Sequence, residues 1–343
     1  MRIKNAVGTM WGPSAAALKW AYNGIVIPTF SYGCLVWARA CHGTLAKDRL
    51  SKLNRLIALS MMPLRKGTPT AGLEVALDLM PLDLKIEELS LRAMLRVLPH
   101  NRTKWPGFGE KGKGHLKWGK NMLLAAGVNH LSFDTFNELN INPKYNVDLD
   151  SFKSGLPTSV SEVVAYTDGS KLCGRAGYGF GVTQGQHVIS SGNGYLGLEN
   201  TVFQAEVLAL QKAADSLLVE NCKSVTFFSD SQAAIAALTN LKIKHQTVAN
   251  CIDSLNLLAK TKEVNISWVK AHANHPGNEY ADMEAKSGTS NYNNTVATPV
   301  PLSWAKSKLA LFYQKLWQDR WSSLTYARQT KIWFPNFNKK GLT

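Results

Sequence analysis

The sequence has few cysteines and few acidic residues, and both shortages exclude classes of protein. Five cysteines are scattered over 343 residues, and no two of them form a Cys-x-x-Cys pair. An odd number of widely spaced cysteines argues against a disulfide framework and against a zinc site. It favours a nuclear or cytoplasmic protein over a secreted one. Asp and Glu number 24 against 39 Lys and Arg, which gives a formal net charge of +15. The chain is 45% hydrophobic, so global disorder is excluded.

Long uninterrupted apolar segments are also scarce. Residues 20–38 carry no charge and are nearly numerous enough to span a bilayer, but Asn23, Pro28 and Gly33 interrupt them. We therefore expect a helix, a break at Pro28 and a second apolar run. No membrane partner is expected.

The positive charge lies outside the central part of the chain. Residues 1–150 hold 20 Lys and Arg against 11 Asp and Glu, and residues 291–343 hold 8 against 1. Residues 151–290 hold 11 against 12. Basic flanks around a slightly acidic centre suit a polyanion bound by the flanks. The alternative is that the lysines only keep the surface solvated.

Apolar spacing predicts a helical domain over residues 1–98. Helices are expected over 14–27, 48–61, 68–79 and from Pro81 to Leu98. Residues 99–155 mix cations with aromatic residues and turn residues, so they form either a basic linker or a surface that grips phosphates and stacks on bases. The domain boundary is placed near residue 155. The basic tail, residues 291–343, is partly helical and either packs on the first domain or binds nucleic acid.

Four acidic residues stand out in the central segment. Asp168 and Asp230 close strand-like runs, whereas Glu206 and Asp282 lie in helical patterns. Singly, each has an ordinary explanation as a turn residue, a helix cap or a solvated carboxylate near a helix N-terminus. Together they predict a site, because the carboxyl edge of a sheet is the usual place for chemistry in α/β folds.

The same segment predicts a five-stranded mixed sheet with helices on both faces. Strands are expected over 162–168, 176–183, 186–191, 223–229 and 263–269, and helices over 201–219, 231–239, 246–260 and 278–287. The first three strands form an antiparallel meander, and the later ones follow helical crossovers. Gly177, Gly179 and Gly181 open no helix, so a dinucleotide motif is excluded. We expect these glycines to let a nucleic-acid backbone approach closely.

Four sequence blocks follow one another between residues 166 and 282. They are Tyr166-Thr167-Asp168-Gly169-Ser170, then Gln204-Ala205-Glu206, then Ser229-Asp230-Ser231, then His272 with Pro276-Gly277-Asn278-Glu279 and Ala281-Asp282. In this order and spacing they resemble a type 1 ribonuclease H domain. The resemblance implies a ribonuclease H-like fold for residues 156–290 and a metal-dependent endonuclease that hydrolyses the RNA strand of RNA/DNA hybrids.

The resemblance also implies roles for individual residues. Asp168, Glu206, Asp230 and Asp282 would hold two Mg²⁺ ions, or Mn²⁺, because hard cations prefer oxygen ligands. Asp168 would bridge both ions, Asp282 would serve the ion that activates water, and Glu206 with Asp230 would serve the other. The resemblance makes His272 a mobile helper in proton transfer or product release.

Substrate contacts are expected from a small set of neighbouring residues: Gly169, Ser170, Gln204 and Asn278. The family has an Asn-Gln pair where Val202-Phe203 stands here. Gln204 either replaces that pair in contacting 2′-hydroxyls or forms a capping box with Thr201.

A second set of motifs lies in the first domain. They are Leu18-Lys19-Trp20-Ala21-Tyr22, Ile27-Pro28, Tyr32-Gly33, Val36-Trp37, Asn54-Arg55-Leu56, Thr68-Pro69-Thr70-Ala71 and Met80-Pro81-Leu82. They resemble the reverse transcriptase thumb and its connection to ribonuclease H in non-LTR retrotransposon polyproteins. The sequence has no Asp-Asp pair, so the polymerase signature of those polyproteins is absent. Two hypotheses follow: a retrotransposon ribonuclease H, or a nucleic-acid-binding fragment of such a polyprotein that no longer cleaves.

Overall fold

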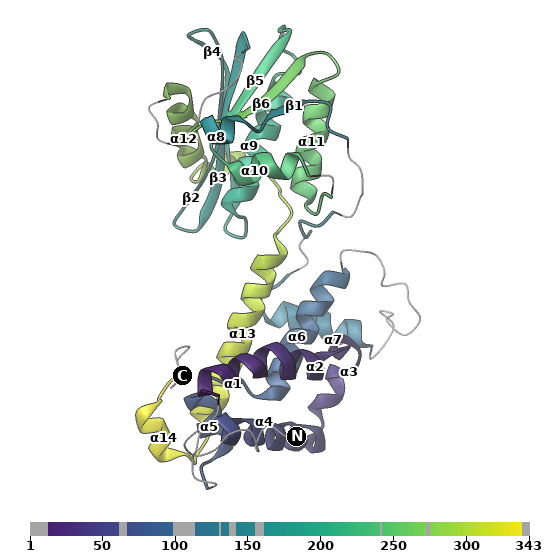
Figure 1. The fold of residues 1–343 in the computed structure, drawn as a ribbon, viewed down its shortest axis with the longest axis vertical. Helices are drawn as coiled ribbons and strands as arrows, with labels where there is room; N and C mark the ends of the chain where they lie inside the picture. Colours follow the sequence, from purple (N-terminus) through teal and green to yellow (C-terminus); the bar gives the residue numbers. More distant parts are fainter. Residues whose placement is uncertain are drawn as a thin grey trace. The chain divides into compact units, whose positions relative to one another are not determined.

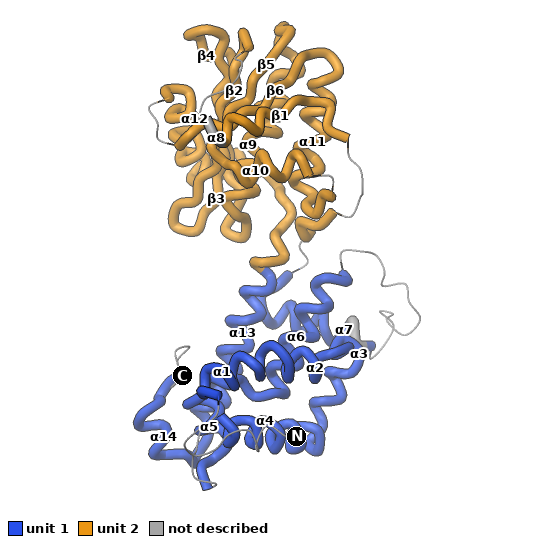
Figure 2. Tube along the Cα trace, viewed as in Figure 1, with its two compact units in different colours: residues 1–130, 305–343 blue, residues 131–304 orange. Residues whose placement is uncertain are grey.

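The computed structural model of the protein describes residues 13–61, 67–98, 114–129, 132–136, 142–154, 161–240, 242–271 and 275–337. The chain divides into two compact units, residues 1–130 with 305–343 and residues 131–304 (Figure 2). The expected domain boundary near residue 155 therefore falls inside the second unit. The boundary lies earlier than expected because residues 146–148, before residue 155, add a strand to the sheet of the second unit.

The first unit is helical (Figure 1). Its helices are α1 (Ala15–Ala21), α2 (Ile27–Ser31), α3 (Cys34–Trp37), α4 (Thr44–Met61), α5 (Thr70–Ala76), α6 (Leu82–Val97), α7 (His115–Ala125), most of α13 (Leu302–Ser323), and α14 (Arg328–Trp333). Apolar faces of α4, α5 and α6 form one core, with Ile57, Leu73 and Leu82 fully buried. Helix α7 lies where a linker was expected; the Trp105 and Phe108 part of that linker is outside the described residues.

The expected break at Pro28 is wrong. Pro28 lies in α2, and a π-helical turn (Tyr22–Val26) leads into it, so the helical segment continues through this proline to Ser31. The chain bends instead at Gly33, whose φ of +63° suits glycine. Among the described residues no single helix is long and apolar enough to cross a membrane; residues 15–31 with 34–42 meet that test only as a pair bent by 57°.

The C-terminal segment belongs to the helical unit. Arg320 on α13 forms a bidentate pair with Asp83 on α6, with N–O distances of 2.9 and 2.8 Å. The Tyr313 hydroxyl donates to Glu87 on the same helix, and Trp321 is buried. Of the two expectations for the tail, packing on the first domain is the one observed for this part.

The second unit contains a six-stranded mixed sheet. Its strands are β1 (Asn146–Asp148), β2 (Val163–Leu172), β3 (Arg175–Gln184), β4 (His187–Gly197), β5 (Ser224–Ser229) and β6 (Glu263–Trp268). Their order is β1-β6-β5-β2-β3-β4, with β2, β3 and β4 antiparallel and β1, β6, β5 and β2 parallel. The five predicted strands are present, and β1 is a sixth that the sequence analysis placed in the linker.

Helices cover both faces of this sheet, as expected (Figure 1). They are α9 (Val202–Ser216), α10 (Gln232–Leu238), α11 (Gln246–Leu258) and α12 (Pro276–Gly288), with a short α8 (Ser151–Ser154). Side chains alternate along β3, so its glycines face α12, while Tyr178 and Phe180 join the core that α9 also fills.

The glycines of β3 seat a helix and do not receive nucleic acid. A Cβ atom on Gly177 would overlap the backbone nitrogen of Thr289, and one on Gly179 would overlap the backbone nitrogen of Ala285. Helix α12 therefore rests directly on the strand. The expectation that these residues admit a nucleic-acid backbone is wrong, because α12 already occupies that space.

Candidate functional site

Three of the four predicted carboxylates come together. Asp168, Glu206 and Asp230 each offer an oxygen, and these oxygens all lie within 4.8 Å of one another. Asp168 and Glu206 are 7% and 6% exposed, and Asp230 is partly exposed. Positions up to 62 residues apart in the chain thus form one cluster of acidic groups at the sheet.

Two adjacent parallel strands place the two aspartates. Strands β2 and β5 pair in parallel register, and the last pair is Thr167 with Ser229. Asp168 and Asp230 each follow this last pair directly, so the two aspartates lie at the same edge of the sheet. We expected Asp168 to be the last residue of its strand, but β2 continues to Leu172. The cap of α10 is Ser231, whose hydroxyl accepts from Ala234 N, and the carbonyl of Asp230 accepts from the Trp268 indole at 2.9 Å.

Close packing of β2 against α9 places Glu206. A Cβ atom on Gly169 would lie 2.5 Å from the Glu206 nitrogen, so only glycine permits this approach. The backbone N–H of Gly169 lowers the pKa of both Asp168 and Glu206, which offsets part of the rise that burial causes in these two groups. Gly169, predicted as a substrate contact, thus has a defined role in building the carboxylate cluster.

The cluster carries a large electrostatic cost. Burial, together with the charges of Asp230 and Asp282, raises the pKa of Asp168 from 3.8 to about 7. Burial also raises the pKa of Glu206 well above its ordinary value, with Asp168 and Asp230 adding to the rise. Like charges in a poorly solvated site repel each other, so a bound cation would relieve the repulsion.

The donor set fits a hard divalent cation. The Oε2 atom of Glu206 is buried and has no hydrogen-bond partner. Buried carboxylate oxygens normally have partners, so an orphaned one beside two aspartates needs an explanation. Carboxylate oxygens are the ligands that Mg²⁺ and Mn²⁺ prefer.

Asp282 lies beside this group of three without belonging to it. It is on α12, and its charge is close enough to raise the pKa of Asp168. Its Oδ2 atom pairs with Lys286 Nζ at 2.6 Å, one turn further along the helix. This hydrogen bond raises the pKa of Lys286. The role of Asp282 as a metal ligand stays a prediction.

The remaining predicted residues have different surroundings. His272 lies outside the described residues. Asn278, on the first turns of α12, is buried, and its Oδ1 atom has no hydrogen-bond partner. Ser170 is half-buried on β2. Their contacts with substrate remain predictions.

Gln204 has a structural role that uses the hydrogen-bonding groups of its side-chain amide, so these groups are not free to contact substrate. Its side chain is 1% exposed and completes a capping box with Thr201 at the start of α9. Its Nε2 atom donates to Asp134 Oδ2 at 3.0 Å and to the Pro299 carbonyl at 2.8 Å. Of the two hypotheses for Gln204, the capping box is the one observed, and the predicted substrate contact is corrected because the amide is buried and fully used.

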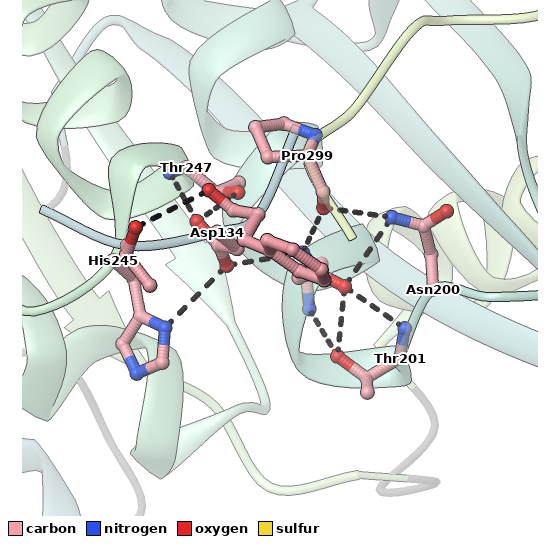
Figure 3. A network of polar contacts seen from close by, with 9 residues as sticks. Asp134, Asn200, Thr201, His245, Thr247 and Pro299 are labelled. Atoms are coloured by element: carbon pink, nitrogen blue, oxygen red, sulfur yellow. Dashed lines mark hydrogen bonds and ion pairs between the residues drawn. The ribbon is translucent and has the colours of Figure 1, made fainter. Parts of the chain in front are cut away.

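Asp134 is the centre of this network, and the sequence analysis missed it (Figure 3). Its Oδ1 atom accepts from the Thr247 nitrogen and hydroxyl, so it caps α11, and His245 lies 3.4 Å from Oδ2. Burial raises the pKa of Asp134, but hydrogen bonds from His245 and Thr247 outweigh burial and lower it. No local pattern marks a cap supplied from 113 residues away.

A family model and a curated relative both identify this chain as similar to ribonuclease H. The family model described as RNase H matches residues 160–290. Ribonuclease H of Syntrophus aciditrophicus (strain SB) is 30% identical over 141 residues, which cover 36% of this chain and 79% of that protein. The crystal structure of RNase H1 from Halobacterium salinarum NRC-1 aligns with a TM-score of 0.32 and 22% identity, over 37% of this chain and 97% of that one.

One relative is a transposon protein. The putative 115 kDa protein in type-1 retrotransposable element R1DM of Drosophila melanogaster is 30% identical over 96 residues, or 28% of this chain. The chain spans only 9% of the length of that protein.

Proposed function

Because the chain belongs to the ribonuclease H family through residues 160–290, we propose that it hydrolyses the RNA strand of RNA/DNA hybrids at the Asp168, Glu206 and Asp230 cluster. The observation that carries the proposal is the convergence of three carboxylates within 4.8 Å, two of them buried. Such a cluster is costly to fold, and its cost is explained if the cluster binds cations.

Asp168, Glu206 and Asp230 would hold the divalent cations, and Asp282 would complete the set from α12. When bound, Mg²⁺ supplies Lewis-acid stabilisation of phosphate charge and an activated water. The protein's own part is positional. The absence of a Cβ on Gly169 lets α9 bring Glu206 beside Asp168, and Glu206 keeps a buried Oε2 atom without a hydrogen-bond partner.

Lys286 also contributes to the electrostatics of this site. Its ammonium group pairs with Asp282, so in the absence of cations it offsets part of the negative charge of the cluster.

We further propose that the chain is part of a retrotransposon's reverse-transcription machinery, with the helical unit as a reverse transcriptase thumb and connection. The similarity to the R1DM protein supports this context. In that setting the enzyme removes template RNA after copying, and the basic residues outside the sheet domain bind the nucleic acid.

A second candidate is a nucleic-acid-binding fragment that no longer cleaves. The observation in its favour is Gln204, whose amide is buried and bonded to Asp134 and Pro299. It therefore does not replace the family's Asn-Gln pair, and 2′-hydroxyl recognition needs other residues.

A cleavage assay separates the two candidates. Labelled RNA/DNA hybrid, double-stranded RNA and double-stranded DNA are incubated with Mg²⁺ and either the parent or the Asp230→Asn variant. The proposal predicts that the parent cuts the hybrid alone and that the variant loses at least about 100-fold in rate. The Asp253→Asn variant, an exposed acid on α11, is the matched control and should cut like the parent. A parent that binds the hybrid but leaves it intact supports the second candidate.

A further inference from the structure

A cavity in the helical unit is lined by cations. Its volume is about 420 Å³, and it lies among α6, the start of α13, and the turn that joins α2 to α3. Arg92, Arg96 and Lys306 line it, together with Ser31 and Gly33. No Asp or Glu is among its described lining residues. All of them belong to one compact unit.

The cations of this cavity have unused hydrogen-bonding capacity. Arg92 pairs with Glu88 at 2.6 Å through its Nη2 atom, but its Nε atom is buried and has no partner. Glu88 also accepts from Lys85 at 3.0 Å, so its single charge is shared between two cations. Arg96 and Lys306 have no ion pair within the part of the chain that the structure describes. The cavity therefore carries an excess of positive charge, which favours an anionic ligand.

An exposed aromatic side chain stands beside the cavity. Tyr32 lies between the lining residues Ser31 and Gly33 and is 88% exposed. The Trp37 indole donates to the carbonyl of Tyr32 at 2.9 Å, which holds the turn without using the tyrosine ring. Proteins that bind single-stranded nucleic acid combine two features: cations that bind the phosphates and a neighbouring aromatic ring on which a base stacks.

We propose that this cavity binds a phosphodiester group of a single-stranded nucleic acid, with a neighbouring base stacked on Tyr32. The inference rests on the proposed function only for its class of ligand. A lipid headgroup would present the same phosphate chemistry, and Trp20 and Ile25 are also exposed nearby in sequence. Nucleic acid is favoured because the same chain carries a domain of a nucleic-acid-hydrolysing family and a formal net charge of +15.

Fluorescence anisotropy with the full chain tests the proposal. The protein is titrated into a labelled single-stranded RNA in EDTA at several salt concentrations. The RNA has about 20 nucleotides, which is longer than the usual site size of single-strand-binding proteins. The test variants are the double variant Arg96→Ala with Lys306→Ala, and Tyr32→Ala. Arg92 is left in place because its loss would strip buried Glu88 of one partner. The matched control is Arg49→Ala with Lys52→Ala, two exposed cations on α4 that do not line the cavity.

The double variant should bind about tenfold more weakly, and the slope of log K against log salt should fall by about 0.7 for each phosphate that the protein no longer neutralises. Tyr32→Ala should also weaken binding about tenfold but leave that slope unchanged, because stacking involves no counterion release. The control should change affinity less than about twofold beyond its effect on net charge. Circular dichroism melts check that each variant is folded.

Two results overturn the proposal. One is a double variant that binds RNA as tightly as its control does. The other is loss of binding to anionic phosphatidylserine vesicles in the double variant with RNA binding unchanged, which would assign the cavity to a lipid headgroup. If the parent cleaves hybrids while the variants match the control, this inference alone fails. If the parent cleaves nothing yet binds RNA through Arg96, Lys306 and Tyr32, the hydrolase proposal alone fails.

Discussion

Replacing Asp168 with asparagine is expected to stabilise the protein when no divalent cation is present. The folded state holds this carboxyl group in a buried site beside Asp230 and Asp282, which raises its pKa from 3.8 to about 7. Folding therefore opposes ionisation of Asp168 near neutral pH. An asparagine has nearly the same shape and no charge to bury.

The size of the effect follows from the pKa shift. One pKa unit corresponds to about 1.4 kcal/mol, so a rise of about three units sets an upper limit of about 4 kcal/mol. Solvent and salt screen part of the repulsion, and the Gly169 N–H stabilises a neutral amide less than it stabilises the carboxylate. We expect a net gain of about 1–3 kcal/mol, or roughly 3–10 °C in the melting temperature of a domain of this size.

The pH dependence has a definite sign. For a carboxyl group whose folded pKa is raised, stability is lost as the pH rises from the ordinary value of 3.8 to the folded value of about 7. The gain from Asp168→Asn should thus be small near pH 4 and reach its maximum above about pH 7.

Thermal unfolding of the full chain in EDTA, followed by circular dichroism and calorimetry at pH 5 and pH 8, measures this difference. Asp253→Asn is the control, since exposed substitutions usually change stability by less than about 0.5 kcal/mol. Adding Mg²⁺ should raise the melting temperature of the parent more than that of the variant. A lower melting temperature for Asp168→Asn in EDTA, or an equal gain at both pH values, would refute the reasoning.

Three further predictions test the packing within each of the two units. Gly179→Ala should destabilise the sheet domain by about 2 kcal/mol or more and abolish cleavage of hybrids, because its Cβ meets the backbone of α12. In Gly181→Ala the nearest atoms belong to the Tyr280 ring, a side chain that can shift, so this variant should lose less stability. Denaturant unfolding and the hybrid assay compare the two variants. Asp134→Ala should cost about 2–3 kcal/mol in denaturant unfolding by removing the cap of α11 and a partner of Gln204, and a loss below about 0.5 kcal/mol would contradict this role. Arg320→Leu should destabilise the helical unit by about 1–3 kcal/mol, because Asp83 loses a bidentate partner but the half-exposed Arg320 side chain means that solvent screens part of the interaction. The double variant with Asp83→Leu should recover most of that loss.

Much of the sheet domain was predictable because its signals are local. Apolar runs bounded by turn residues marked five of the strands, and Thr201 with Gln204 marked the start of α9 as one of two hypotheses. Side-chain spacing alone likewise predicted helices over 48–61 and from Pro81 to Leu98, which the structure has as α4 (Thr44–Met61) and α6 (Leu82–Val97). In these segments local preference and tertiary packing agree.

The errors came where distant segments decide the outcome. Strand β1 is three residues long and exists only because β6 offers it an unpaired edge, so no periodicity marks it. The glycines of β3 looked like a surface for nucleic acid because their partner, α12, begins about 95 residues later. Pro28 looked like a break because the π-helical turn before it cannot be inferred from spacing.

The sequence by itself determined which residue types the site has: four acidic residues in ordered motifs, a basic excess outside them, and helices and strands to carry them. Only the tertiary structure decided which of these carboxylates lie within 4.8 Å of one another and that Gln204 is buried against Asp134. It also decided that residues 305–343 pack into the first unit. The physical reason is that motifs specify chemistry and local backbone preference, whereas distances between side chains depend on packing between segments far apart in the chain.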